Sequence, residues 1–282
     1  MAFGVTTATG VNSTAGTSHT ITLPGSIAAG DLLIIVFADS VGTGSTNSFS
    51  GSFTGLTKGN NGTGVGIQVA YKIAAGSDTC TVTTTGSTKS AHNSYRITGW
   101  HGTTVPEQGT ASTATALAID PPSLTPSWGS ADTLWLEVAA HGSASAALSA
   151  LSTNYTDLLT VVTSGGSPTT NVTCGSGRRI TTTATENPDN VMAWFSGTPT
   201  WVANTIAIRP TAGSSTPVTV AAVAVGVTAL TTLNIWARTL AATAVGVSAL
   251  TKAALYLRTL AATSIGVGAL TKTITAAITT LA

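Results

Sequence analysis

Residues 19–39 read HTITLPGSIAAGDLLIIVFAD and carry the first evidence for the fold class. His19, Ile21 and Leu23 alternate with threonine, which is the pattern of a strand with one buried face. Turn-forming residues follow at 24–25 and 29–31. The apolar run at 32–37 is unbroken and too short for an ordinary helix, so it predicts a strand that is buried on both faces.

Strand patterns recur along the chain, separated by turn residues. Residues 133–141, TLWLEVAAH, are a second candidate for a core strand, and 172–185 predict a hairpin that turns near Gly175–Gly177 with Arg178 and Arg179 at its tip. Residues 38–65 predict a long exposed loop or ragged hairpin. The remaining predicted strands are 66–73, 79–85, 90–100, 192–197 and 201–210. This spacing predicts an all-β body over 1–210, a β-sandwich or jelly roll.

The composition supports an all-β chain. Charged residues make up 7% of the 282 residues and hydrophobic residues 43%. Thr, Ser, Gly and Ala replace the missing charges, and these residues suit exposed strands and tight turns. The net charge of +1 gives no argument for nucleic acid or an anionic membrane as partner.

The last part of the chain repeats itself every twenty residues. The blocks read AAVAVGVTALTTLNIWARTL (221–240), AATAVGVSALTKAALYLRTL (241–260) and AATSIGVGALTKTITAAITT (261–280), and the first two agree at 12 of 20 positions. Such a period is typical of stacked units that cannot bury an apolar face alone. We expect 218–282 to form a shaft that joins copies of the chain, after a linker at 211–217. The recurring apolar positions expected to make that assembly are Val227, Val247, Val267, Leu230, Leu250 and Leu270.

Three structures for the repeats remain open. A helix turns by about 2000° over twenty residues, which places equivalent residues on nearly opposite sides, whereas a strand keeps its in/out register because twenty is even. Val, Thr, Ile and one Gly per block also favour strands over helix. The uncharged stretch 218–237 has the length of a membrane-spanning helix, but Asn234 and the many Thr and Ala residues disfavour it. The third interpretation is helix packing through small residues.

No catalytic, cofactor-binding or metal-binding motif is present in the sequence. The histidines 19, 92, 101 and 141 are scattered without zinc-ligand spacing and are expected on strand surfaces or loops. The isolated acids Asp31, Asp39, Asp120, Asp132 and Glu137 are expected at turns and strand ends. The sequence also lacks a nucleophile elbow, a phosphate-binding loop and a dinucleotide fingerprint. We therefore expect a protein that is not an enzyme.

Aromatic and sulfur-containing residues supply the other candidates. Trp135, Trp194 and Trp201 lie inside strand patterns and are expected in the core, whereas Trp100 and Trp128 flank loops. These last two are the candidates for stacking on a sugar at the surface. Cys80 and Cys174 are far apart in β-like surroundings and predict two buried free thiols rather than a disulfide.

Four stretches resemble a known family. They are TITLPGSIAAGDLLIIVFAD (20–39), VAYKIAAGSDTCTVT (69–83), YRITGW (95–100) and WVANTIAIRP (201–210). In this order they resemble β-sandwich modules of tailed-phage structural proteins and bacterial surface proteins, over residues 5–210. The repeats look like the LAATAVGV-type arrays at the ends of phage minor structural proteins. The resemblance implies a non-enzymatic module of a virion.

The sequence thus leads to a main hypothesis and two alternatives. The main hypothesis is a phage virion component (fibre, decoration or minor tail protein) that forms a homo-oligomer, a trimer by expectation, with other virion proteins and a host glycan as further partners. The N-terminus, MAFGVTTATG, has no signal-peptide pattern, so we expect export inside an assembled particle. The alternatives are a bacterial surface adhesin or carbohydrate-binding module, and a membrane-active protein.

Overall fold

The computed structural model divides the chain into two compact units, Met1–Ala212 (the body) and Gly213–Ala282 (the repeat unit). In the body it describes residues 3–142, 147–164, 171–189, 192–194 and 199–211. In the repeat unit it describes the backbone of five strands. The division falls inside the segment 211–217 that the sequence predicts as a linker. All regular elements of the described residues are strands, apart from one short 3-10 turn, η1 (Gly42–Gly44), so the all-β prediction is confirmed.

The first sheet of the body has the strand order β1-β7-β2-β6-β4. Its strands are antiparallel, and two short strands, β3 and β5, pair with β7 and β6. The bounds are β1 (Gly4–Ile21), β2 (Leu32–Asp39), β3 (Asn47–Phe49), β4 (Thr54–Gly55), β5 (Gly59–Asn61), β6 (Val65–Ile73) and β7 (Cys80–Thr98).

The second sheet has the order β13-β14-β11-β16-β8, and β9 also pairs with β16. Its strands are β8 (Glu107–Gln108), β9 (Ser112–Thr115), β11 (Ala131–Gly142), β13 (Thr156–Val162), β14 (Val172–Thr183) and β16 (Thr200–Ile208). A small third sheet has the order β10-β15-β12, with β10 (Ala118–Ile119), β12 (Leu148–Ala150) and β15 (Met192–Trp194).

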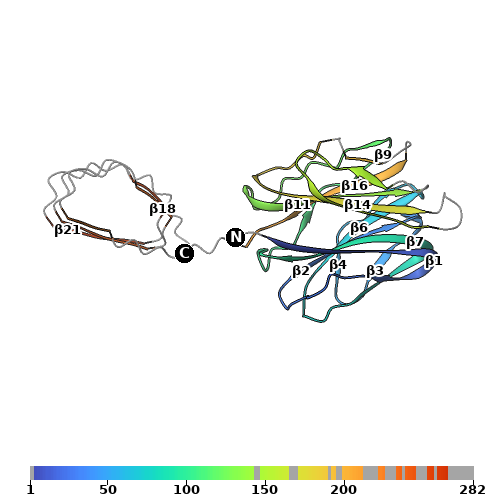
Figure 1. Ribbon diagram of the computed structural model, residues 1–282, viewed down its shortest axis with the longest axis horizontal. Coiled ribbons are helices and arrows are strands. Elements are labelled where there is room, and N and C mark those ends of the chain that lie inside the picture. Colours follow the sequence, from blue (N-terminus) through green and yellow to red (C-terminus); the bar gives the residue numbers. More distant parts are fainter. Residues whose placement is uncertain are drawn as a thin grey trace. The chain divides into compact units, whose positions relative to one another are not determined.

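The first and second sheets form the two layers of a β-sandwich (Figure 1). Side chains at even positions of β2 and β11, such as Ile34 and Leu136, fill the space between them. Polar residues also link the layers: Ser176 Oγ lies 2.5 Å from Tyr95 Oη and accepts a hydrogen bond from Asn93 Nδ2 at 2.7 Å. These hydrogen bonds within the core fix the position of β7 relative to β14.

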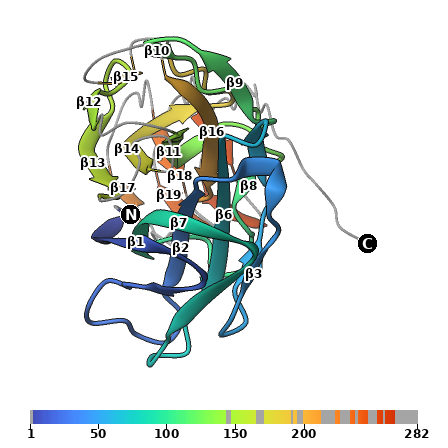
Figure 2. The same ribbon diagram turned by 90° about the vertical axis from the view of Figure 1, so that its right-hand side faces the viewer.

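The outer faces of both sheets are covered as well. On the first sheet Leu33, Ile35 and Phe37 pack with Ile21, Phe53 and Val82. On the second sheet Ala139 packs with Ile119, Leu148 and Met192 of the third sheet, which lies over it in Figure 2. Strands β2 and β11 are therefore buried on both faces, as their sequences predict.

Several strands differ from the prediction. β14 is one continuous strand rather than a hairpin at Gly175–Gly177, because Leu148 and Leu151 pack against the glycine backbones where a Cβ would lie within 2.7 Å of them. A glycine that makes room for a neighbour has the same sequence signature as a turn glycine. β1 and β7 are likewise longer than their predicted strands, and each continues through an irregular register at Gly16.

The prediction of an exposed loop at 38–65 is also wrong in part. This segment contains η1 and three short strands, and Phe53 is buried in the outer core of the first sheet. Asp39, near its start, and Lys58, in its second half, form an ion pair at 2.6 Å in which the carboxylate is fully buried. Long-range packing of these few residues orders a segment whose composition is that of a loop.

In the repeat unit, equivalent strands of successive repeats pair in parallel. β17 (Ala222–Val225) pairs with β19 (Thr239–Val245), β19 with β21 (Thr259–Ile265), and β18 (Leu233–Trp236) with β20 (Ala253–Tyr256). Every pair joins residues twenty apart, for example Ala222 with Ala242. Strands, which the sequence favours over helix, therefore account for the described part of the repeats.

None of the described residues belongs to a helix with the length and hydrophobicity needed to cross a membrane.

Candidate functional site

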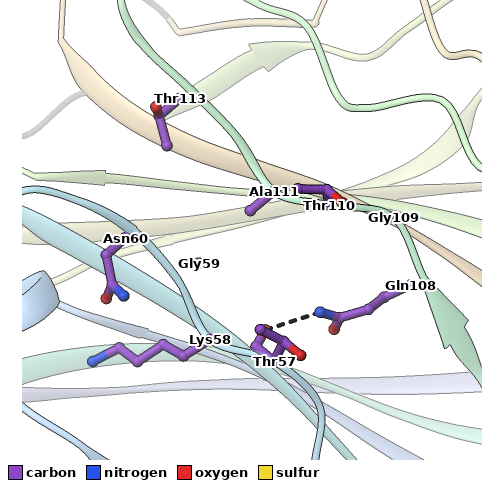
Figure 3. A pocket seen from close by; sticks show the side chains of 9 residues that line it. All are labelled: Thr57, Lys58, Gly59, Asn60, Gln108, Gly109, Thr110, Ala111 and Thr113. Atoms are coloured by element: carbon purple, nitrogen blue, oxygen red, sulfur yellow. Dashed lines mark hydrogen bonds between the residues drawn. The ribbon is translucent and has the colours of Figure 1, made fainter.

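A cleft of about 380 Å³ with a mixed polar and apolar lining lies where the β5 segment of the first sheet meets the β8–β9 segment of the second. Figure 3 shows its lining, which comes from two stretches of chain about fifty residues apart. The lining residues are Thr57, Lys58, Gly59, Asn60, Gln108, Gly109, Thr110, Ala111 and Thr113. The volume falls within the range of small-molecule sites.

Close backbone contact builds the floor of the cleft. A Cβ atom on Gly59 would lie 2.6 Å from Ala111 Cβ and 2.9 Å from Val202 Cγ2, so only glycine allows the two sheets to approach here. Two amides then join the segments: Gln108 Nε2 donates to Thr57 O at 2.9 Å, and Asn61 Nδ2 donates to Ala114 O at 3.0 Å. The cleft therefore lies at a contact between the two sheets, and these contacts hold its backbone in place.

The electrostatics of the cleft are close to neutral. Lys58 Nζ lies 2.6 Å from Asp39 Oδ2 and donates to Gly42 O and Ser45 O, each at 2.9 Å. These contacts use its three N–H donors. Gln108 Oε1 is buried and has no hydrogen-bond partner within the described part of the chain. The cleft thus presents hydroxyl and amide side chains together with small apolar groups and no net charge, a lining that suits a small neutral ligand.

Two buried carboxyl groups lie elsewhere, under the layer that covers the second sheet. Glu137 is 0% exposed, and burial raises the pKa of its carboxyl to about 7, with Asp189 and Glu186 adding to the shift. Glu186 is 3% exposed, and burial also raises its pKa, although Arg179 lies 2.9 Å away and opposes the shift. Neither residue lines the cleft. A ligand in the cleft therefore does not meet these two groups.

The structure corrects the assignment of Trp100 to the surface. Trp100 is 6% exposed, its Nε1 donates to Gly30 O at 2.9 Å, and its backbone bridges to Pro210. It packs into the core between the sheets, so its ring faces are not available to a sugar. The position beside a loop misled the prediction, because contacts with segments far away in the chain, Gly30 and Pro210, hold Trp100 in the core.

The other tryptophans have different environments. Trp128 is half-buried, packs against the cluster of Trp135 and Tyr155, and donates from Nε1 to Thr133 Oγ1 at 3.0 Å. Trp128 retains an exposed part and remains a candidate for surface contact. The predictions of core positions for Trp135 and Trp201 are confirmed, and the side chain of Trp194 lies outside the described residues.

Three histidines expected on strand surfaces or loops are instead buried. His19, His92 and His141 are 0%, 1% and 2% exposed, because the outer faces of the sheets are covered. Burial lowers the pKa of His92 and of His141 to about 4. His92 Nε2 accepts the Thr22 N–H at 2.9 Å, which places any ring proton on Nδ1. Within the described ranges no three His, Cys, Asp or Glu side chains are grouped to hold a metal ion.

The acids and cysteines divide between confirmed and wrong predictions. Asp31 and Asp39 cap turns: Asp31 Oδ2 accepts the Ala28 N–H and Asp39 Oδ1 the Gly42 N–H, both at 2.8 Å. The prediction that Glu137 lies at a turn or strand end is wrong, since it lies in the middle of β11. Cys80 and Cys174 are free and buried, as predicted.

The basic pair is also placed differently from the prediction. Arg178 and Arg179 lie within β14, and they pair with Asp157 and Glu186 at 2.5 and 2.9 Å. The six assembly positions predicted in the repeats, Val227, Val247, Val267, Leu230, Leu250 and Leu270, lie outside the described residues.

Comparison with protein-family profiles, curated proteins and solved structures found no match for this chain. The fold and the cleft therefore define a class only: a β-sandwich body followed by a repeat of parallel strands. Sequence reasoning missed the cleft because no local motif marks it. Its residues become neighbours only when the two sheets pack.

Proposed function

We propose that this protein is a non-enzymatic structural component of a tailed-phage virion, a fibre, decoration or minor tail protein that assembles through its repeats and displays its body. The observation that carries the proposal is the parallel pairing of repeat strands at a constant offset of twenty residues. Solenoid proteins stack repeats in this way and often serve as extended scaffolds.

Two features of the repeat unit support assembly, the composition of its strands and their parallel pairing. Strands β17, β19 and β21 are rich in Ala, Val and Thr. The four charged residues of the whole repeat unit are all basic: Arg238, Lys252, Arg258 and Lys272. Short strands of small apolar residues bury little surface within one chain. Association of several chains, a trimer in our proposal, would bury more of that surface and would hold the bodies together.

The body supports display. Its hydrophobic clusters lie within residues 3–208, so it has the components of an independently folded domain. Many linked copies turn weak individual contacts into firm attachment, which is how a virion surface protein uses a modest binding site.

The test compares the full-length chain with a chain that ends at Thr211. That end point keeps the Trp100–Pro210 bridge and the hydrogen bond from Thr211 N–H to Gly99 O. We expect multi-angle light scattering to show oligomers for the full-length chain and fewer copies per particle for the body alone. Far-UV circular dichroism should show β-structure in both. Equal molar mass in the two chains at high concentration would refute assembly through the repeats.

A point variant sharpens this test. Ala242 lies in the central strand β19 and pairs on both sides, with Ala222 and Ala262. Proline removes a backbone donor and breaks a central strand, so Ala242→Pro should lower the molar mass of the full-length chain. Ser215→Pro, in the predicted linker, is the matched control and should not.

A second candidate function, binding of a host carbohydrate, is favoured by the uncharged cleft and by the hydroxyl and amide side chains that line it. The cleft replaces Trp100 as the candidate site. We expect glycan-array or calorimetric binding to a neutral oligosaccharide that weakens at least tenfold in Gln108→Leu and is retained in Trp128→Ala. Binding lost only in Trp128→Ala would move the site to that tryptophan, and no binding by the wild type would remove this candidate.

A further inference from the structure

The outer edge of β1 differs from every other edge of the sandwich. β1 is an edge strand that, among the described strands, pairs only with β7. It is eighteen residues long, and its sequence, GVTTATGVNSTAGTSHTI, contains no proline, acid, lysine or arginine. A long edge strand of this kind presents a row of unpaired backbone N–H and C=O groups to any strand that can reach it.

The remaining edges carry the features that block such pairing. The far edge of the first sheet is divided between β4 and β5, which pair with β6 and have two and three residues. β8 and β9, with two and four residues, do the same for the second sheet. Its other edge, β13, has a register shift between Thr156 and Leu159, with Asp157 at a positive φ of 56° and paired to Arg178. Short strands, irregularities and charges are the usual protection of sheet edges, and β1 lacks all three from Gly4 to Asn12.

The open part of β1 has definite limits. Its register with β7 is continuous from Gly4 to Asn12 and then shifts. At Ser13 the strand meets the second sheet, where Ser164 N–H donates to Ser13 Oγ at 3.0 Å. A partner strand therefore has about nine residues available, a length of roughly 30 Å.

We propose that this edge binds the same edge of a second copy, antiparallel, about a two-fold axis at Ala8. In this register Val5 lies opposite Val11 of the other copy, Thr7 opposite Thr9, and Ala8 opposite itself. Val11 is 42% exposed in one copy and would be covered by Val5 of the other. β-branched pairs of this kind stabilise antiparallel strands, and an uncharged strand meets its own copy without repulsion.

The contact is small compared with a standard protein interface, so its affinity in dilute solution is low. It becomes effective when other contacts hold the copies at high local concentration. It would join two first sheets into one continuous sheet across the two bodies, and it uses no residue of the repeats. A substitution can therefore remove the contact through β1 without altering any residue of the contact through the repeats.

The test is a site-specific disulfide in the full-length chain. In Ala8→Cys the two cysteines lie directly opposite each other, and the Cα separation across an antiparallel pair, about 4.5–5.5 Å, lies within the range of disulfides. We expect mild oxidation to give a covalent dimer of Ala8→Cys. Thr6→Cys is the matched control: residue 6 faces residue 10 of the other copy, so it should crosslink at least tenfold less. Native Cys80 and Cys174 are buried and do not compete.

A second variant tests the contact without forming a covalent bond. Ala8→Lys places two ammonium groups against each other only in the dimer, so it should abolish concentration-dependent association of the chain ending at Thr211 while its circular dichroism stays unchanged. The proposal is overturned if Ala8→Cys crosslinks no more than Thr6→Cys. It is equally overturned if the wild-type body and Ala8→Lys scatter identically up to the highest soluble concentration. The scattering readout uses the chain that ends at Thr211, so it does not depend on whether the repeats assemble.

Discussion

Replacing Glu137 with glutamine isolates the contribution of one buried carboxyl group to the stability of the body. Glu137 is 0% exposed, and its Oε1 accepts the Ser152 N–H at 3.0 Å. Its Oε2 has no hydrogen-bond partner among the described residues. Burial disfavours the ionised carboxylate, and this raises the pKa in the folded state to about 7 from an ordinary value of 4.5.

The sign of the effect follows from proton binding. Between pH 4.5 and 7 the folded state keeps the Glu137 proton that the unfolded state has released. The free energy of unfolding therefore falls as the pH rises through this window, and the contribution of Glu137 is constant outside it. The difference between the two pKa values corresponds to about 3 kcal/mol.

The assay is urea unfolding of the full-length chain between pH 4 and pH 8.5, followed by tryptophan fluorescence. Glutamine keeps the acceptor for Ser152 and does not titrate, so Glu137→Gln should match the wild type near pH 4 and exceed it by about 3 kcal/mol at pH 8. Asp120→Asn, on the exposed surface, controls for the loss of one acidic group. A difference between Glu137→Gln and the wild type that does not change with pH would refute the reasoning.

Three further predictions concern the packing of the body. Lys58→Met should cost about 3–5 kcal/mol in the free energy of unfolding, because it leaves the buried Asp39 carboxylate without its partner at 2.6 Å; equal urea midpoints for Lys58→Met and wild type would contradict this. Gly175→Ala should cost about 1–3 kcal/mol, since its Cβ would lie 2.7 Å from Leu148 Cδ2, whereas Gly16→Ala, with open space around its Cβ, should stay within about 0.5 kcal/mol in the same assay. Both thiols should resist Ellman's reagent in the native protein, because burial raises the pKa of Cys80 to about 11 and of Cys174 to about 12. Both should react once the protein is unfolded in about 8 M urea. Fast reaction of either thiol in the native state would contradict their burial.

The sequence predicts strands more reliably than it predicts which of their faces are covered. The runs 32–37 and 133–141 predict their burial directly, because a strand packed on both sides needs apolar residues at every position. His92 and Glu137 do not fit that rule, and their burial depends on segments far away in the chain. The sequence predicts a turn at Gly175 and Gly177 because glycine serves both turns and close packing. Only the neighbouring leucines distinguish the two roles.

For the candidate site and the β1 edge, too, the sequence shows the residues but not which of them become neighbours. The sequence contains Gln108 and Lys58 as ordinary polar residues of loops, and it does not reveal that they line one cleft. Likewise the uncharged composition of β1 is legible in the sequence, but its position at an edge, beside better protected edges, is a property of the strand order.

By itself the sequence determined that the body is built of strands, that two of these strands lie at its centre, and that the last part repeats every twenty residues. These properties depend on periodicity and local side-chain chemistry, which each segment carries alone. Tertiary structure alone decided that Trp100 is buried, that two polar segments meet in a cleft and that β1 is left with a free edge. Each of these depends on which distant segments meet, and that is set by the packing of both sheets at once rather than by any one stretch of residues.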